Sequence, residues 1–134
     1  MIGQERCAIP RVRAPMNSTK SVILVVEDDP LILIHSRMAL EDAGYEVVSA
    51  ASGEAALCEV ARRDDLDALF TDIELSGAVD GVSVAEAMRL ANPDASIVVT
   101  SGKQAPGNDD LPDGGRFMAK PYTAAQMRRA LADC

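Results

Sequence analysis

Four short apolar runs, far apart in the sequence, each end at a side chain that can take part in chemistry. These side chains are Glu27, Asp28, Asp29, Asp72, Thr100 and Lys120. Carboxylate oxygens are the ligands that hard divalent cations prefer, and a carboxylate can also attack a phosphoryl group. A hydroxyl and an ammonium nearby can bind the anionic phosphoryl oxygens. The combination predicts a metal-binding site that accepts a phosphoryl group.

The pattern of apolar residues predicts the elements that position these side chains. Uninterrupted runs such as Val22–Val26 are typical of strands buried on both faces of a parallel sheet. Strands are predicted over residues 22–26, 45–49, 68–71, 97–100 and 117–119. Helices are predicted over residues 30–43, from a cap at Ser52 to the acidic Asp64, over residues 82–91, and from a capping box formed by Thr123 and Gln126.

This order of strands and helices indicates an α/β fold, a doubly wound parallel sheet with helices on both faces, because crossover connections are right-handed. In such open sheets, ligands bind beyond the carboxyl ends of the strands, at the topological switch point. The six side chains named above all stand at the ends of predicted strands. The predicted topology therefore gathers residues that the sequence scatters.

The first predicted helix, residues 30–43, is apolar over a wide arc. The stripe expected to face the sheet consists of Leu31, Ile34 and Met38. Ile32 and Leu33 lie beside that stripe and exceed what one sheet face needs, so we expect them to dock a partner. His35 is expected to be a partly buried packing residue rather than a carrier of phosphate.

The composition excludes several classes of function. A formal net charge of −8 and a pI of about 4.5 argue against a nucleic-acid surface. The three cysteines have no metal-binding spacing, which suits a reducing cytoplasm. No stretch approaches the roughly 20 apolar residues of a membrane span. Residues 1–20 are basic and show no periodicity, so they are predicted to form a flexible tail before one domain, residues 21–134.

Taken as an ordered set, four motifs resemble those of a receiver domain of two-component response regulators. They are VILVVEDDP, LFTDIELSG, IVVTSG and FMAKPY, and the resemblance runs from about Ser21 to the C-terminus. It implies a flavodoxin-like fold with a five-stranded sheet in the order 2-1-3-4-5. It also implies phosphorylation by a histidine kinase or a histidine phosphotransfer protein, in the presence of Mg²⁺.

Within each motif, the resemblance assigns roles by position. Asp72 is the implied phosphoacceptor, Lys120 the cation beside it, and Thr100 the hydroxyl that binds the new phosphoryl group. For Mg²⁺, it implies direct ligation by Asp28 and Asp72, a contact through water from Glu27, and a backbone carbonyl from Glu74. The implied conformational switch pairs Thr100 with Phe117.

One segment departs from the family pattern. Between Thr100 and Phe117, where a receiver has its fourth helix, the sequence is SGKQAPGNDDLPDGGR. Proline and glycine both disfavour a helix, and the segment has no repeated apolar spacing. We predict that this helix is reduced or absent, that Gly102–Gly115 is an extended loop, and that phosphorylation orders it.

The combined prediction is a free-standing, cytoplasmic receiver that signals to an unknown downstream protein through protein contacts, without nucleic acid or membrane. It is not expected to be a conventional turnover enzyme. One alternative is a small Mg²⁺-dependent phosphohydrolase with an aspartyl nucleophile, although no Asp follows two residues after Asp72. Another is a receiver-like interaction module that takes no phosphate, which would predict missing site residues.

Overall fold

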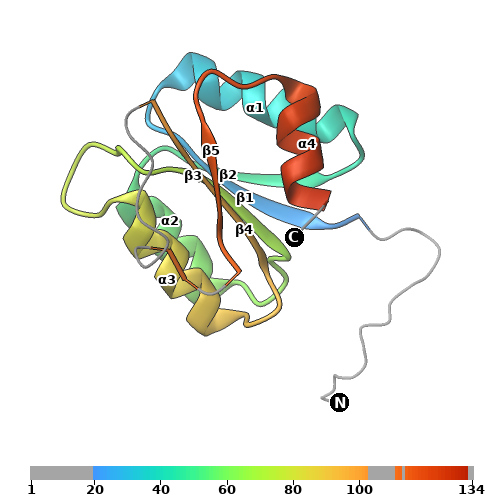
Figure 1. The fold of residues 1–134 in the computed structure, drawn as a ribbon. Helices are drawn as coiled ribbons and strands as arrows, with labels where there is room; N and C mark the ends of the chain where they lie inside the picture. The colour runs from blue at the N-terminus through green and yellow to red at the C-terminus, as the bar shows by residue number, and fades with distance from the viewer. Residues whose placement is uncertain (1–19, 103–110, 113, 133–134) are drawn as a thin grey trace.

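The computed structural model describes residues 20–102, 111–112 and 114–132 (Figure 1). In chain order the elements are β1 (Val22–Val26), α1 (Pro30–Asp42), β2 (Glu46–Ala50), α2 (Gly53–Arg62), β3 (Ala68–Asp72), α3 (Gly81–Ala91), β4 (Ser96–Ser101), β5 (Arg116–Ala119) and α4 (Ala124–Ala132). The predicted elements are all present, with boundaries that differ by one or two residues. Apart from Lys20, the predicted tail lies outside the described residues.

The sheet confirms the predicted topology. Its five strands run parallel in the order β2-β1-β3-β4-β5. Figure 1 shows α1 and α4 on one face of the sheet and α2 and α3 on the other. β1 and β3 are neighbours and end side by side, with Val26 opposite Thr71, while Asp72 is opposite Thr100 of β4. The residues that follow these strands therefore meet at one edge of the sheet.

The central strand β1 is apolar without interruption because both faces of the sheet are covered. In β1, Leu24 and Val26 belong to the cluster beneath α2 and α3, whereas Ile23 and Val25 belong to the cluster beneath α1 and α4. All five residues of β1 and all five of β3 are buried. Each buried aliphatic side chain contributes about 1.5–3 kcal/mol of hydrophobic stabilisation. This burial holds the central strands, and hence the site at their ends, in a fixed register.

The helices begin within a residue or so of their predicted starts, at capping side chains. Asp29 caps α1 by accepting hydrogen bonds from the backbone N–H groups of Leu31 and Ile32, and Ser52 caps α2. The predicted capping box is confirmed, since the Thr123 hydroxyl accepts from the Gln126 N–H and the Gln126 side chain accepts from the Thr123 N–H. Among the described residues, no helix combines the length and apolar character that crossing a membrane requires.

The predicted orientation of α1 is wrong. The stripe expected to face the sheet is exposed: 78% for Leu31, 55% for Ile34 and 57% for Met38. The sheet instead contacts Leu33, Ser36, Ala39 and Leu40. His35, expected to be partly buried, is also exposed.

The reason for this error is that apolar residues surround much of α1. A stripe at helical spacing exists on either side, so periodicity alone could not choose between them. Leu33, predicted to dock a partner together with Ile32, packs against the core beneath α1 and α4. The exposed apolar stripe of α1 (Leu31, Ile34 and Met38) is thus the surface that a partner can reach.

The described part of the connection from β4 to β5 contains no helix. Residues 102, 111–112 and 114–115 are non-helical, and Gly114 has a φ of 75°. Leu111 packs against the core beneath α2 and α3, so this end of the connection is anchored to the fold. The rest of the predicted loop, residues 103–110 and 113, lies outside the described residues, as does the predicted ordering on phosphorylation.

The orientation of α1 can be tested by replacing Leu40 and Leu31 with alanine, each in a separate variant. Leu40→Ala is expected to lower the free energy of unfolding by about 2–5 kcal/mol, because it leaves a cavity in the core. Leu31→Ala is expected to change it by less than about 0.5 kcal/mol. Urea unfolding followed by circular dichroism measures both values. Equal losses would show that Leu31 also packs on the sheet.

Candidate acidic metal-binding and acceptor site

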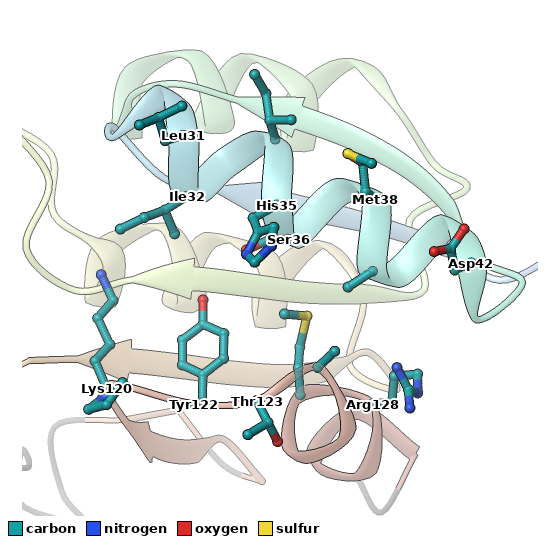
Figure 2. A pocket seen from close by; sticks show the side chains of 15 residues that line it. Leu31, Ile32, His35, Ser36, Met38, Asp42, Lys120, Tyr122, Thr123 and Arg128 are labelled. Carbon is teal, nitrogen blue, oxygen red and sulfur yellow. The ribbon is translucent and has the colours of Figure 1, made fainter.

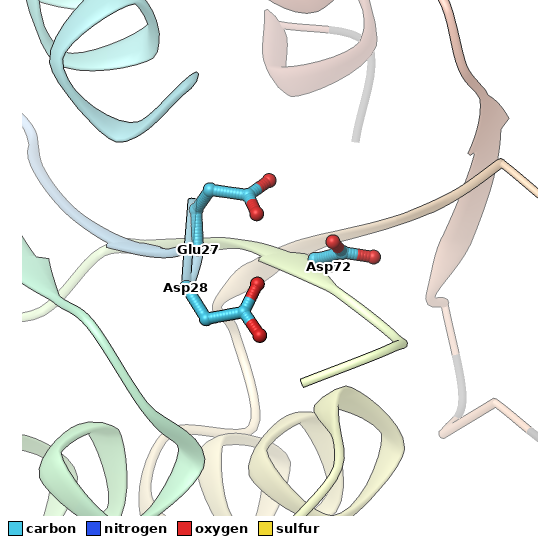
Figure 3. A group of neighbouring side chains, drawn as sticks. All are labelled: Glu27, Asp28 and Asp72. Carbon is cyan, nitrogen blue, oxygen red and sulfur yellow. The ribbon is translucent and has the colours of Figure 1, made fainter. Parts of the chain in front are cut away.

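Three carboxylates from two neighbouring strands meet at the carboxyl edge of the sheet. Glu27 and Asp28 directly follow β1, and Asp72 is the last residue of β3. One oxygen from each lies within 4.8 Å of the others, and Figure 3 shows the three side chains around a common space. The structure therefore brings together the acidic residues that the sequence predicted to share a site.

The cluster carries a high electrostatic cost. Glu27 is only 4% exposed and Asp72 only 5%. Burial is the main cause that raises the pKa of Glu27, and the nearby charge of Asp72 raises it further. Hydrogen bonds from the Asp29 N–H and from Lys120 act in the opposite direction without cancelling the rise. Two buried like charges favour a bound cation, which would relieve their repulsion.

Lys120 supplies one such cation from the protein itself. Its Nζ donates to Asp72 Oδ2 at 2.8 Å and to Glu27 Oε1 at 3.2 Å. Burial alone lowers the pKa of Lys120, but the hydrogen bond and charge of Asp72, together with those of Glu27, outweigh that effect and raise it. The ammonium therefore stays protonated beside the predicted acceptor. Lys120 directly follows β5, and its side chain reaches Glu27 after β1 and Asp72 at the end of β3.

Asp28 differs from its two neighbours in being more accessible. Its Oδ2 accepts a hydrogen bond of 2.9 Å from the Ser76 N–H, which is the main cause that lowers the pKa of this carboxyl. A carboxylate has two oxygens and several lone pairs, so this bond leaves capacity for a cation. Asp28 is thus ionised, partly solvated and linked to the loop after β3, as expected of a direct metal ligand.

The loop after β3 contains a contact that sequence reasoning missed. The Ser101 hydroxyl, at the end of β4, donates to Glu74 Oε2 at 2.6 Å. The Glu74 N–H in turn donates to Asp72 Oδ1 at 3.1 Å. Only the backbone carbonyl of Glu74 had been assigned a role, whereas the structure shows its N–H and its carboxylate engaged. The sequence signal was the hydroxyl residue next to Thr100, which alternation along a strand would direct to the other face.

Thr100 and Phe117 lie on the neighbouring strands β4 and β5. Thr100 is buried at the end of β4, opposite Asp72 in the strand register. Phe117 is half-buried in β5, opposite Val99. The two residues therefore occupy neighbouring strands, one position out of register. Their predicted switching stays a prediction.

The end of β3 also depends on a glycine. A Cβ at Gly81, the first residue of α3, would collide with the carbonyl oxygen of Asp72. The Gly81 N–H donates to Ile73 O at 3.0 Å, which closes the loop back onto the strand. Only glycine fits this close approach. The helix start and the predicted acceptor are consequently fixed relative to each other.

The donor set fits a hard divalent cation. The cluster offers carboxylate oxygens from three side chains and no nitrogen or sulfur ligand. Mg²⁺ prefers such oxygen ligands and binds with few protein ligands while keeping several waters. A metal held there would lie against Asp72, with Lys120 on one oxygen of that carboxylate. Such an arrangement can bind a phosphoryl group between a metal and an ammonium.

Comparison with known proteins agrees with this geometry. A family model described as the response regulator receiver domain matches residues 23–132. The chain is 30% identical over 118 residues to the transcriptional regulatory protein PrrA of Mycobacterium tuberculosis, covering 81% of this chain and 47% of that protein. It is 37% identical over 113 residues to the nitrogen assimilation regulatory protein NtrX of Azorhizobium caulinodans, covering 78% and 24%. The chain therefore spans half or less of the length of these relatives.

A solved structure supports the fold as well. The crystal structure of a response regulator receiver protein from Sinorhizobium medicae superposes with a TM-score of 0.82 at 29% identity, covering 85% of this chain and 93% of that one. This match confirms the flavodoxin-like fold that the motifs implied.

The role of Asp28 as a metal ligand can be tested with its neighbour as a control. Asp28→Asn is expected to weaken Mg²⁺ binding by about tenfold, because a charged oxygen ligand becomes neutral. Asp29→Asn is expected to have little effect, since Asp29 caps α1 and asparagine also serves as a cap. Titration calorimetry measures both affinities. Lys120→Ala should not weaken binding, because it removes a competing cation; equal affinity of Asp28→Asn and the unaltered protein would contradict the assignment.

Proposed function

The chain belongs to the response regulator receiver family, and on that premise we propose that Asp72 accepts a phosphoryl group from a histidine kinase or a histidine phosphotransfer protein. The observation that carries the proposal is the contact of Lys120 Nζ with Asp72 Oδ2 at 2.8 Å, in a cluster with Glu27 and Asp28. It unites an acceptor, a fixed cation and a metal-binding set at the carboxyl edge of the sheet.

The proposed reaction is an in-line transfer. The phosphorus–nitrogen bond of the donor phosphohistidine breaks while a bond forms between phosphorus and a carboxylate oxygen of Asp72. The histidine nitrogen keeps the electron pair and takes up a proton. Lys120 would stabilise the negative charge that develops on the phosphoryl oxygens, and Mg²⁺, when held by Asp28 and Asp72 and through water by Glu27, would neutralise the remaining charge. Because the groups are already in place, little reorganisation is needed.

Thr100 and Phe117 are proposed to convert this chemistry into a signal. The Thr100 hydroxyl would hydrogen-bond the new phosphoryl group, and its displacement would leave room for Phe117 to move inward. Thr100 lies on β4 and Phe117 on the edge strand β5, where Phe117 is only half-buried. A half-buried ring on the strand next to that of Thr100 is compatible with two packings, as a phosphorylation switch requires.

The two alternative functions receive less support. A phosphohydrolase needs a second carboxylate free to activate water, and Glu74, two residues after Asp72, is bound by Ser101. A module that takes no phosphate should lack part of the site, yet all of the predicted acidic and basic side chains lie together. We therefore propose a phosphorylated signalling protein rather than a turnover enzyme.

The exposed apolar stripe of α1 is the proposed contact with the phosphoryl donor. It borders a groove of about 1110 Å³ between α1 and α4, shown in Figure 2, and Lys120 lies at one end of this groove. A helical donor packed there would have its histidine close to Asp72. The strong negative charge of the chain favours signalling through protein contacts over direct binding to nucleic acid.

Asp72 is expected to become phosphorylated when the protein is incubated with Mg²⁺ and a small phosphodonor such as acetyl phosphate. Mass spectrometry should show one added phosphoryl group on the unaltered protein and none on Asp72→Asn, because an amide oxygen is a poor nucleophile. Asp94→Asn, an exposed aspartate in the turn before β4, is the control and should label normally. Equal labelling of Asp72→Asn would exclude Asp72 as the acceptor.

The proposed docking surface can be separated from the chemistry. Replacing Leu31 and Ile34 with lysine is expected to reduce transfer from the cognate kinase by about tenfold or more, since buried apolar contacts dominate interfaces. Labelling by acetyl phosphate should be unchanged. Leu90→Lys on α3 is the control, because Leu90 is also exposed, at 86%, but lies on the opposite face of the sheet. A similar loss for Leu90→Lys, or none for the double variant, would refute docking at α1.

A further inference from the structure

The loop that holds Asp28 is itself held by Glu54, a residue without a role in the proposed reaction. The Ser76 N–H donates to Asp28 Oδ2 at 2.9 Å. Two residues further along the loop, the Ala78 N–H donates to Glu54 Oε2 at 3.2 Å. Glu54 lies in the first turn of α2, which covers the same face of the sheet as α3 (Figure 1). One short stretch of backbone therefore joins the N-terminus of α2 to the acidic cluster.

The turn between these two hydrogen bonds lies directly against Glu54. Gly77, between Ser76 and Ala78, has a φ of 99°, in the left-handed region that favours glycine. A Cβ at Gly77 would lie 3.2 Å from both carboxylate oxygens of Glu54. The Glu54 carboxylate thus approaches two successive residues of the turn, and a side chain larger than that of glycine would press on it.

The end of the turn is packed more firmly than its middle. A Cβ at Gly53, the first residue of α2, would collide with the carbonyl oxygen of Val79, and Val79 packs against the core beneath α2 and α3. Residues 76–78 are exposed, and they are held by the hydrogen bonds to Asp28 and Glu54. Exposed backbone with few packing contacts opens easily, so its position depends on each bond that it makes.

We propose that Glu54 is a positioning residue for the metal site: by accepting from the Ala78 N–H it fixes the turn that holds Asp28, and so sets the orientation of the Asp28 carboxylate towards a cation. This inference rests on the Mg²⁺ binding that the proposed function requires. It extends the residues on which the site depends from the strand ends to the first turn of α2.

Metal binding is sensitive to such positioning. One oxygen of Asp28 accepts from the Ser76 N–H and the other remains for a cation, so a movement of Ser76 turns the whole carboxylate. Mg²⁺ demands near-octahedral geometry and tolerates misplaced ligands poorly. Loss of a group that orients a metal ligand costs about 10–100-fold in affinity. Glu54 acts through one further step and its hydrogen bond is exposed, so we expect a smaller loss of about three- to tenfold.

The experiment compares Glu54→Ala with Glu54→Gln. Both substitutions remove the negative charge of residue 54, but glutamine retains an oxygen that can accept from the Ala78 N–H. If the charge of Glu54 attracted the cation from a distance, the two variants would lose the same Mg²⁺ affinity. If Glu54 positions the turn, the alanine variant should lose affinity and the glutamine variant should retain it.

A second pair of variants disturbs the same contact from the loop. Gly77→Ala places a methyl group against the Glu54 carboxylate, at a φ that alanine rarely adopts. Gly44→Ala is the matched control, because Gly44 has the same φ of 99° and a Cβ there would meet nothing within 4 Å. Gly44 precedes β2, at the edge of the sheet opposite the acidic cluster. The two substitutions share their backbone strain, and only Gly77→Ala touches the turn.

Two properties of each variant are measured. The first is the protection of the Ser76 amide proton from exchange with water, followed by NMR without metal. The second is the Mg²⁺ affinity from titration calorimetry, and unfolding in urea shows that each variant is folded. Glu54→Ala and Gly77→Ala are expected to lower the protection and to weaken Mg²⁺ binding by about three- to tenfold. Glu54→Gln and Gly44→Ala should stay within about twofold of the unaltered protein.

Two results would overturn the inference. One is an unchanged Mg²⁺ affinity in folded Glu54→Ala, whatever the protection of Ser76. The other is an equal loss of affinity in Glu54→Ala and Glu54→Gln, which would mean that charge alone acts. Should Gly77→Ala fail to fold, the two Glu54 variants decide. Failure of the proposed function looks different: Mg²⁺ would bind with the same dependence on Glu54, yet the unaltered protein would take no phosphoryl group at Asp72.

Discussion

Burial of two carboxylates around one ammonium is the interaction on which this structure depends. Glu27 and Asp72 are almost inaccessible to solvent, and Lys120 bridges them. A buried ion pair stabilises a protein only if its geometry is well held, since desolvation costs several kcal/mol per ion. The parallel strands provide that geometry by burial on both faces. The remaining negative charge of the three carboxylates favours a bound cation at this edge of the sheet.

The two faces of the sheet contribute differently to the site. On the side of α2 and α3, backbone N–H groups and hydroxyls hold the loops: Asp28 accepts from Ser76, Glu54 accepts from Ala78, and Ser101 binds Glu74. On the side of α1 and α4, a groove and exposed apolar side chains leave a surface uncovered. The first side fixes the acidic groups in place, and the second is suited to contact with another protein.

Orientation of α1 was the main point at which sequence and structure disagreed. Its apolar residues extend almost around the helix, so two stripes were equally compatible with a buried face. The structure selects the one with Leu40 and places Ser36 among apolar neighbours. Leu40 packs in one cluster with Met127 and Leu131 of α4, far along the chain, and local periodicity contains no information about them.

The sequence by itself determined the strand and helix order, the helix caps and the identity of the charged residues at the strand ends. These follow from local rules: apolar runs, capping side chains and the common edge at which parallel strands finish. Only the tertiary structure decided which face of α1 is buried, that Ser101 binds Glu74 and that Ser76 binds Asp28. Each of these is a contact between elements distant in sequence, fixed by packing that involves the whole sheet.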